Sequence, residues 1–171
     1  MADQKENISE YIIQMYRKED LIRAFEFDLE KIGNHVINHL PISNIEKLSQ
    51  VNHYEELIGQ MQNQGIEKEG HLEQVNQLVH ALENICDDLK TNDQQFAQIY
   101  DSALPHIEEN IALSENKITS HIQICLNGIY GFLLLKLNGK KLDDQNQTKV
   151  EKFGEVLSYL SMRYREISGS N

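Results

Sequence analysis

The segment from Ile122 to Leu137 (IQICLNGIYGFLLLKL) constrains the fold most, because as a helix it is apolar on nearly every side. Only Gln123, Asn127 and Lys136 interrupt it. A helix that is apolar all round is buried, either in a protein core or in a membrane. A membrane span needs roughly 20 apolar residues, whereas this segment is shorter and carries two amides along one edge. We therefore predict a buried central helix that other helices cover.

Two glycines, Gly128 and Gly131, lie three residues apart on one face of this predicted helix. Each lowers helix propensity by roughly 1 kcal/mol relative to alanine. Their missing side chains would let a neighbouring helix approach closely, or would leave a notch for a ligand. Close packing is the simpler interpretation, and the notch remains the alternative.

Length and charge limit the classes of protein to which the chain can belong. A chain of 171 residues suits one domain, so we predict a single domain over residues 1–167 and a frayed tail over residues 168–171. With 27 acidic and 16 basic residues the net charge is −11, and such a field repels phosphate backbones, so no nucleic acid is expected as a partner.

The first residues lack the basic and apolar regions of a signal peptide. Two cysteines without a CxxC pair fit a reducing compartment. We expect a cytoplasmic protein that does not associate with membranes.

Apolar residues recur at gaps of three and four along most of the chain, the pattern of amphipathic helices. The first predicted helix reaches Leu40, but the polar stretch from Arg17 to Asp20 leaves open whether it is one helix or two segments with a bend near Asp20. Further helices are predicted over about 44–64, 72–91, 93–111, 122–137 and 144–167. Six helices with short connections, and no alternating strand pattern, predict an all-α, single-domain bundle around the central helix.

Local signals mark several ends of these helices. Ser43 and Glu46 are spaced as a capping box. Thr119 or Ser120 offers a cap for the central helix, and Asn92 with Gln95 resembles another cap. Pro105 predicts a kink in the fourth helix, because proline removes a backbone donor.

Three histidines are the candidate metal ligands. His35 and His39 stand four residues apart on one helix, and His53 would join them if the turn at Pro41 brings the next helix back antiparallel. The pair has no HExxH glutamate. The alternative is that these histidines are solvated flanks of their helices.

A second candidate site consists of polar residues that fall beside predicted core positions. Buried polar groups must find partners, so these side chains either pair with one another or line a pocket inside the bundle. They are the candidate ligand-binding residues Arg23, Glu26, Gln123, Asn127 and Tyr130.

The order of several segments resembles a known family. The segments are ISEYIIQMYRKEDLIRAFEFDLEKIG, HLPIS, PHIEENI, IQICLNGIYGFLLLKLNGK and KFGEVLSYLS. Together they resemble a family of all-helical proteins from gut bacteria that is known only as a domain of unknown function. The resemblance covers nearly the whole chain and implies a compact, stand-alone helical protein of cytoplasmic type. It implies no reaction, cofactor or catalytic residue.

Two functional hypotheses follow. The chain contains no P-loop, Rossmann glycine run, nucleophile elbow or zinc knuckle. We therefore predict no catalytic residue and no cofactor, and whether the chain is an enzyme stays open, with the balance against it. The first hypothesis is a non-catalytic helical interaction or scaffold protein that binds a protein partner or forms a homodimer. The alternative is a small-ligand-binding or metal-dependent enzyme with its site inside the bundle.

Overall fold

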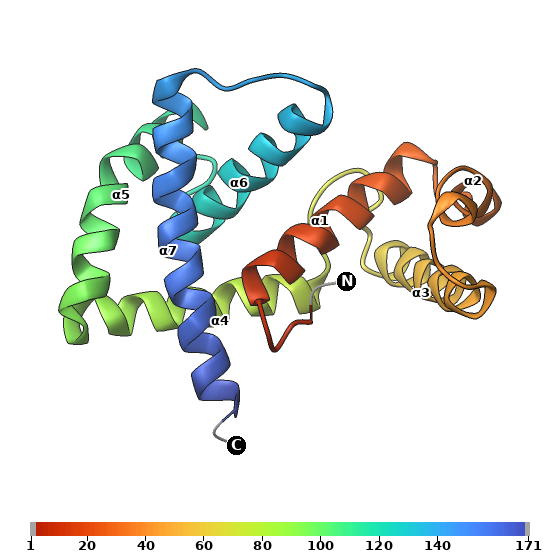
Figure 1. The fold of residues 1–171 in the computed structure, drawn as a ribbon, viewed down its shortest axis with the longest axis horizontal. Coiled ribbons are helices and arrows are strands. Elements are labelled where there is room, and N and C mark those ends of the chain that lie inside the picture. The colour runs from red at the N-terminus through yellow and green to blue at the C-terminus, as the bar shows by residue number, and fades with distance from the viewer. Residues whose placement is uncertain (1–2, 170–171) are drawn as a thin grey trace. The chain divides into compact units, whose positions relative to one another are not determined.

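The computed structural model describes residues 3–169, and all regular secondary structure within them is helical (Figure 1). The all-α fold predicted from the sequence is confirmed. The elements of this described part are α1 (Ile8–Ala24), α2 (Leu29–His35), the 3-10 helix η1 (Ile37–His39), α3 (Asn44–Asn63), α4 (Glu73–Asn92), α5 (Gln94–Leu113), α6 (His121–Leu137) and α7 (Asp144–Gly169).

The described residues form two compact units. The first unit contains residues 3–13 and 77–169, and the second unit contains residues 14–76. The boundaries fall inside α1 and inside α4, so each of these helices contributes residues to both units. That residues 1–167 form a single domain stays a prediction. Of the predicted frayed tail, residues 168–169 are the end of α7, and residues 170–171 lie outside the described part.

The first unit is built around α7, which packs against both α5 and α6 (Figure 1). Its largest fully buried side chains include Phe96, Ile107 and Phe153. The beginning of α1 joins this core through a buried pair of serines, in which the Ser9 hydroxyl lies 2.7 Å from the Ser161 hydroxyl on α7. Small hydroxyls suit this contact, since each satisfies the other where water is excluded.

The second unit combines the rest of α1 with α2, η1, α3 and the start of α4. Its core contains the fully buried side chains of Tyr16, Ile22, Ile32, Ile37, Met61 and Leu72. Arg23 on α1 donates hydrogen bonds to the backbone carbonyls of Ile66, at 3.0 Å, and Gly70, at 2.6 Å. These bonds fasten the α3–α4 connection to α1.

The first predicted helix ends earlier than expected. The helix α1 runs without a break through the polar stretch from Arg17 to Asp20, and it ends at Ala24 rather than near Leu40. Glu26 and Phe27 adopt left-handed backbone angles, with φ of 54° and 62°, and Asp28 then caps α2 by accepting from the Lys31 amide. A left-handed residue satisfies the last carbonyls of a helix and turns the chain away. The apolar stripe continues past this break, which is why periodicity alone did not reveal it.

Two of the three caps predicted from the sequence are found, and the kink predicted at Pro105 stays a prediction. Ser43 and Glu46 form the capping box of α3, and Ser120 accepts from the Gln123 amide at the start of α6. Pro105 lies inside α5, which continues to Leu113. The predicted cap at Asn92 is wrong, because Asp93 accepts from the Phe96 amide at 3.0 Å instead.

Only the first half of α6 is buried as predicted. Ile122, Ile124, Cys125 and Leu126 are buried, whereas the helix becomes exposed from Leu134 onward. Figure 1 shows the reason, because α6 diverges from α7 toward the connection that joins them. The first turns of α6 lie against α7, whereas its last turns do not. Within residues 3–169, no helix has both the length and the apolar character needed to cross a membrane.

Candidate functional site

A groove of about 310 Å³ lies between α5, α6 and α7 in the first unit. We call it the apolar groove, and its apolar lining consists of Leu113, Gly128, Gly131, Phe132, Leu135, Leu142, Val150 and Phe153. Leu113 is 71% exposed and Leu135 is 37% exposed, so leucine side chains at the groove remain in contact with water. Large apolar side chains left exposed around a concave surface are typical of a binding site for a partner.

The two glycines of α6 have different roles in this groove. A Cβ atom at Gly128 would lie 2.5 Å from Cδ2 of Phe153, whose side chain is 1% exposed. A Cβ atom at Gly131 would meet nothing within 4 Å. Gly128 therefore permits close packing of α6 against α7, as predicted, and Gly131 leaves the notch that was the alternative.

The polar edge of α6 is partly paired and partly open. The Gln123 side chain donates a hydrogen bond of 2.9 Å to Oδ1 of Asn127, and both side chains are half-buried. Asn127 also lines the apolar groove. Both interpretations of this edge therefore apply, because the two amides pair and one of them also faces a cavity. Tyr130, on the same helix, is half-buried.

The other two candidate ligand-binding residues belong to the second unit. Arg23 is engaged with two backbone carbonyls and with Asp20, at 3.1 Å. The Glu26 side chain is 83% exposed and lies 3.6 Å from the Lys31 ammonium. The five predicted residues are thus divided between the two units, and their gathering into one site stays a prediction.

The histidines proposed as metal ligands lie in separate surroundings. His35 is exposed and stacks on Phe25, with 6.0 Å between ring centroids, and His39 is exposed in η1. His53 is half-buried on α3, and burial lowers the pKa of its imidazole. Among residues 3–169 no group of three or more histidine, cysteine or acidic side chains is placed to hold a metal ion.

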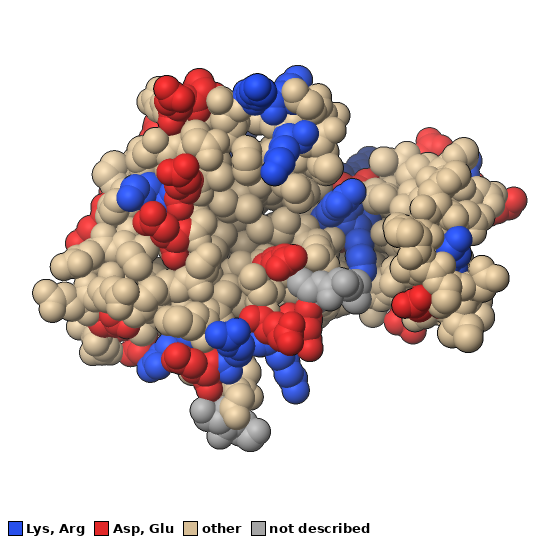
Figure 2. All heavy atoms as spheres, in the orientation of Figure 1, with Lys and Arg blue, Asp and Glu red and all other residues tan. Residues whose placement is uncertain are grey.

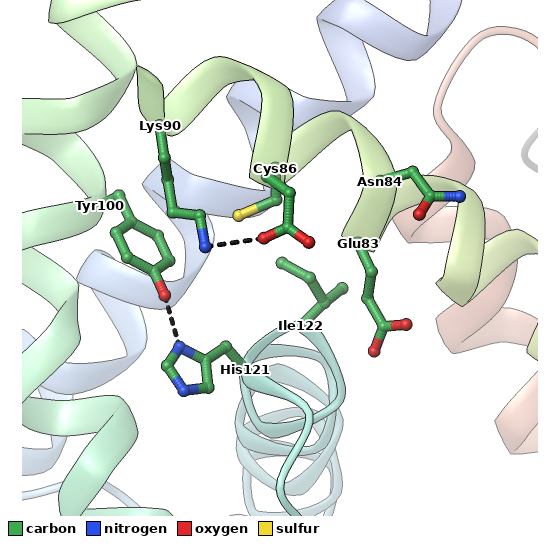
Figure 3. Close-up of a pocket in the computed structure, with 8 residues that line it drawn as sticks. Glu83, Asn84, Cys86, Lys90, Tyr100, His121 and Ile122 are labelled. Atoms are coloured by element: carbon green, nitrogen blue, oxygen red, sulfur yellow. Dashed lines mark hydrogen bonds and ion pairs between the residues drawn. The ribbon is translucent and has the colours of Figure 1, made fainter.

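A second cavity, of about 350 Å³, opens between α4, α5 and the start of α6 (Figure 3). We call it the polar pocket, and it is lined by Glu83, Asn84, Cys86, Asp87, Lys90, Tyr100, His121 and Ile122. The Tyr100 hydroxyl is hydrogen-bonded to Nδ1 of His121. The Lys90 ammonium lies 2.7 Å from Asp87 and 5.1 Å from the centre of the Tyr100 ring.

The polar pocket keeps the Lys90 ammonium charged and the Tyr100 hydroxyl and Cys86 thiol protonated at neutral pH. The hydrogen bond that Lys90 donates to Asp87 raises the pKa of Lys90, and burial raises the pKa of Tyr100. Burial also raises the pKa of the Cys86 thiol to about 11. A thiol needs a lowered pKa to act as a nucleophile near neutral pH, so Cys86 lacks the property that nucleophilic catalysis requires.

The sequence did not identify Tyr100 and His121 as a pair. Tyr100 occupied an apolar stripe of α5, and His121 is the first residue of α6. The two residues are 21 positions apart and lie on different helices. The periodicity of either helix alone therefore does not predict this contact.

A comparison with known proteins agrees with the resemblance noted in the sequence. No curated protein and no solved structure matches the chain. A family described as "Domain of unknown function (DUF4924)" matches residues 1–170. Because this match covers nearly the entire sequence, the chain belongs to the DUF4924 family of domains of unknown function.

Proposed function

We propose that this protein is a non-catalytic, cytoplasmic interaction protein, and that it binds a helical segment of a partner protein in the apolar groove. The observation that carries the proposal is the exposed apolar surface of α6 beside an open groove. Gly131 leaves space in the groove, and Leu135 and Leu113 border that space. Grooves between helices accept the apolar face of a partner helix through side chains spaced three and four residues apart.

The polar pocket supports the non-catalytic part of the proposal. Its charged and hydroxyl groups are engaged with one another: Lys90 with Asp87, Tyr100 with His121, and Glu83 with the Ser120 hydroxyl. Such a network links α4, α5 and α6 as a structural clamp.

Selection from a displayed library of helical peptides, with the purified protein as the target, tests the proposal. Selected peptides are then measured by fluorescence anisotropy against a variant whose groove is filled, Gly131→Leu. Leucine has a higher helix propensity than glycine and finds open space at this position, so the variant is expected to fold. We expect binding to weaken by roughly tenfold or more, the effect of about 1.4 kcal/mol.

The matched control is Gly59→Leu on α3, a helical glycine that also has nothing within 4 Å of an added Cβ. This variant should bind the peptides as the unchanged protein does. Peptides that bind Gly131→Leu as tightly as the unchanged protein would contradict the proposal, as would a selection that yields no peptide.

A second candidate function is the binding of a small polar molecule in the polar pocket. The observation that favours it is the cavity itself, which brings an ammonium, a phenol and an imidazole to one opening (Figure 3). The test is a thermal-shift screen of small metabolites with the unchanged protein and with His121→Ala. A compound that raises the melting temperature of the first and not of the second would favour this function, and a screen in which every compound acts equally on both would count against it.

A further inference from the structure

The segment that forms α6 and its connections reverses the charge of the rest of the chain. Residues 116–142 contain four lysines and no acidic residue, although the whole chain has a net charge of −11. The same segment supplies Gly131, Phe132, Leu135 and Leu142 to the apolar groove. The most apolar part of the protein is therefore also its locally basic part.

Three of these lysines lie next to the apolar groove. Lys136 follows Phe132 by one helical turn, so the two share a face of α6. Lys140 and Lys141 directly precede Leu142, which lines the groove. All three are exposed, and none forms an ion pair with any residue in the described part of the chain. Figure 2 shows lysine and arginine side chains gathered over the connection between α6 and α7.

Two acidic residues follow this cluster closely in the sequence, and a third pairs with a lysine of the groove. Asp143 accepts hydrogen bonds from the backbone and the side chain of Asn146, at 2.8 and 3.2 Å. Asp144 lies in the first turn of α7, where a carboxylate interacts favourably with the helix macrodipole. Glu109 on α5 pairs with Lys149 at 3.1 Å. None of these three carboxylates forms an ion pair with Lys136, Lys140 or Lys141, so the three ammonium groups remain available to a partner.

We infer that the segment bound in the apolar groove is an amphipathic helix whose apolar stripe is flanked by aspartate and glutamate side chains. This inference rests on the proposed function and adds the chemistry of the partner. The apolar stripe fills the space beside Gly131, and the acidic flank lies over Lys136, Lys140 and Lys141. Complementary charges at the edge of an interface accelerate association and exclude partners of the wrong charge.

The same combination of leucines and lysines also occurs on proteins that bind anionic lipid surfaces. The shape of the site favours a helix, because the leucines border a concave groove of about 310 Å³, which admits inserted side chains, whereas a lipid surface binds an apolar face that protrudes. Lipid binding is therefore an outcome that the test must separate.

The experiment uses the peptide library described above, with the positions beside the apolar stripe randomised. Aspartate and glutamate should be enriched at these positions. The affinity of the selected peptides should fall by roughly tenfold in the double variant Lys140→Glu, Lys141→Glu, and should also fall as the salt concentration rises. The matched control, Lys5→Glu with Lys68→Glu, makes the same change in net charge at two exposed lysines outside the groove, and it should change the affinity by less than about twofold.

The possible results separate this inference from the proposed function. If the peptides require an open groove but show no acidic enrichment, or bind both double variants equally, the inference about the partner is wrong and the interaction function stands. If filling the groove with Gly131→Leu has no effect, both are wrong. The protein is also sedimented with vesicles of phosphatidylserine and phosphatidylcholine. If it binds these vesicles and the double variant Lys140→Glu, Lys141→Glu does not, the ligand of this surface is an anionic lipid surface and the inference of an acidic helix is wrong.

Discussion

The carboxylate of Glu19, which is fully buried, lies 2.6 Å from Nδ1 of His71 and accepts a hydrogen bond of 3.0 Å from the Leu72 amide. The Tyr16 ring stacks on His71 at a centroid distance of 3.7 Å. A buried carboxylate is tolerated only when its oxygens have such partners. Within the second unit, this contact fastens α1 to the two residues that precede α4.

Replacing Glu19 with glutamine should lower the free energy of unfolding by about 2–3 kcal/mol, because the neutral amide loses the charge-assisted bonds to His71 and to the backbone. Urea unfolding followed by circular dichroism measures the loss. The control is Glu56→Gln on the exposed surface of α3, which should stay within about 0.5 kcal/mol. Equal stabilities of the two variants would show that the buried contact contributes nothing.

The two glycines of α6 should respond in opposite ways to alanine. Gly128→Ala should destabilise the protein by about 1–2 kcal/mol, because the new methyl group overlaps the buried ring of Phe153. Gly131→Ala should stabilise it by up to about 1 kcal/mol, because alanine has the higher helix propensity and meets open space. Thermal or urea unfolding of the pair measures the difference. A loss of stability in Gly131→Ala would mean that the groove is closed in solution.

Stability should increase at alkaline pH because of Lys18. Burial lowers the pKa of Lys18 to about 8 in the folded protein, whereas the pKa of an unfolded lysine is about 10.4. Below pH 8 both states are protonated, and the cost of burying the charge is present in full. Between these two values the unfolded chain binds more protons, so stability rises with pH. We expect a gain of about 1–2 kcal/mol between pH 7 and pH 9.5, relative to Lys18→Met. Parallel curves for the two proteins would contradict this.

Cys86 should resist alkylation although it lines the polar pocket. Burial raises its thiol pKa to about 11 and raises that of Cys125 further, and only the thiolate reacts. With iodoacetamide at pH 8, Cys86 in the folded protein should react roughly 100-fold more slowly than in urea. Mass spectrometry of timed samples gives both rates. A rate in the folded protein close to the rate in urea would show that the polar pocket opens and exposes the thiol.

The sequence was most informative where structure depends on neighbours along the chain. The capping box of Ser43 and Glu46 and the cap at Ser120 both follow from side chains three residues from the amide that they bind. The end of α1 at Ala24 was missed because neither Glu26 nor Phe27 is a typical residue for left-handed backbone angles. Asn92 and Asp93 both favour the capping position, so local sequence does not decide between them, and in the structure Asp93 is the cap.

Local sequence patterns predicted only part of the candidate site. The notch at Gly131 and the pairing of Gln123 with Asn127 were among the alternatives that the sequence raised, since all three lie on one helix. The contact between Tyr100 and His121 was not, because it joins two helices. Glu19 lies in the polar stretch from Arg17 to Asp20, where local sequence suggests an exposed side chain. It is instead fully buried beside His71, which is 52 residues away in the sequence.

By itself, the sequence determined that this chain is all-helical, where most of its helices begin and end, and that its most apolar helix carries a polar edge. These properties follow from periodicity and capping, which act over three or four residues. Only the tertiary structure decided which half of α6 is buried, where a groove stays open, and which charges find partners. Burial depends on which helices lie alongside one another, and residues distant in the sequence fix that arrangement.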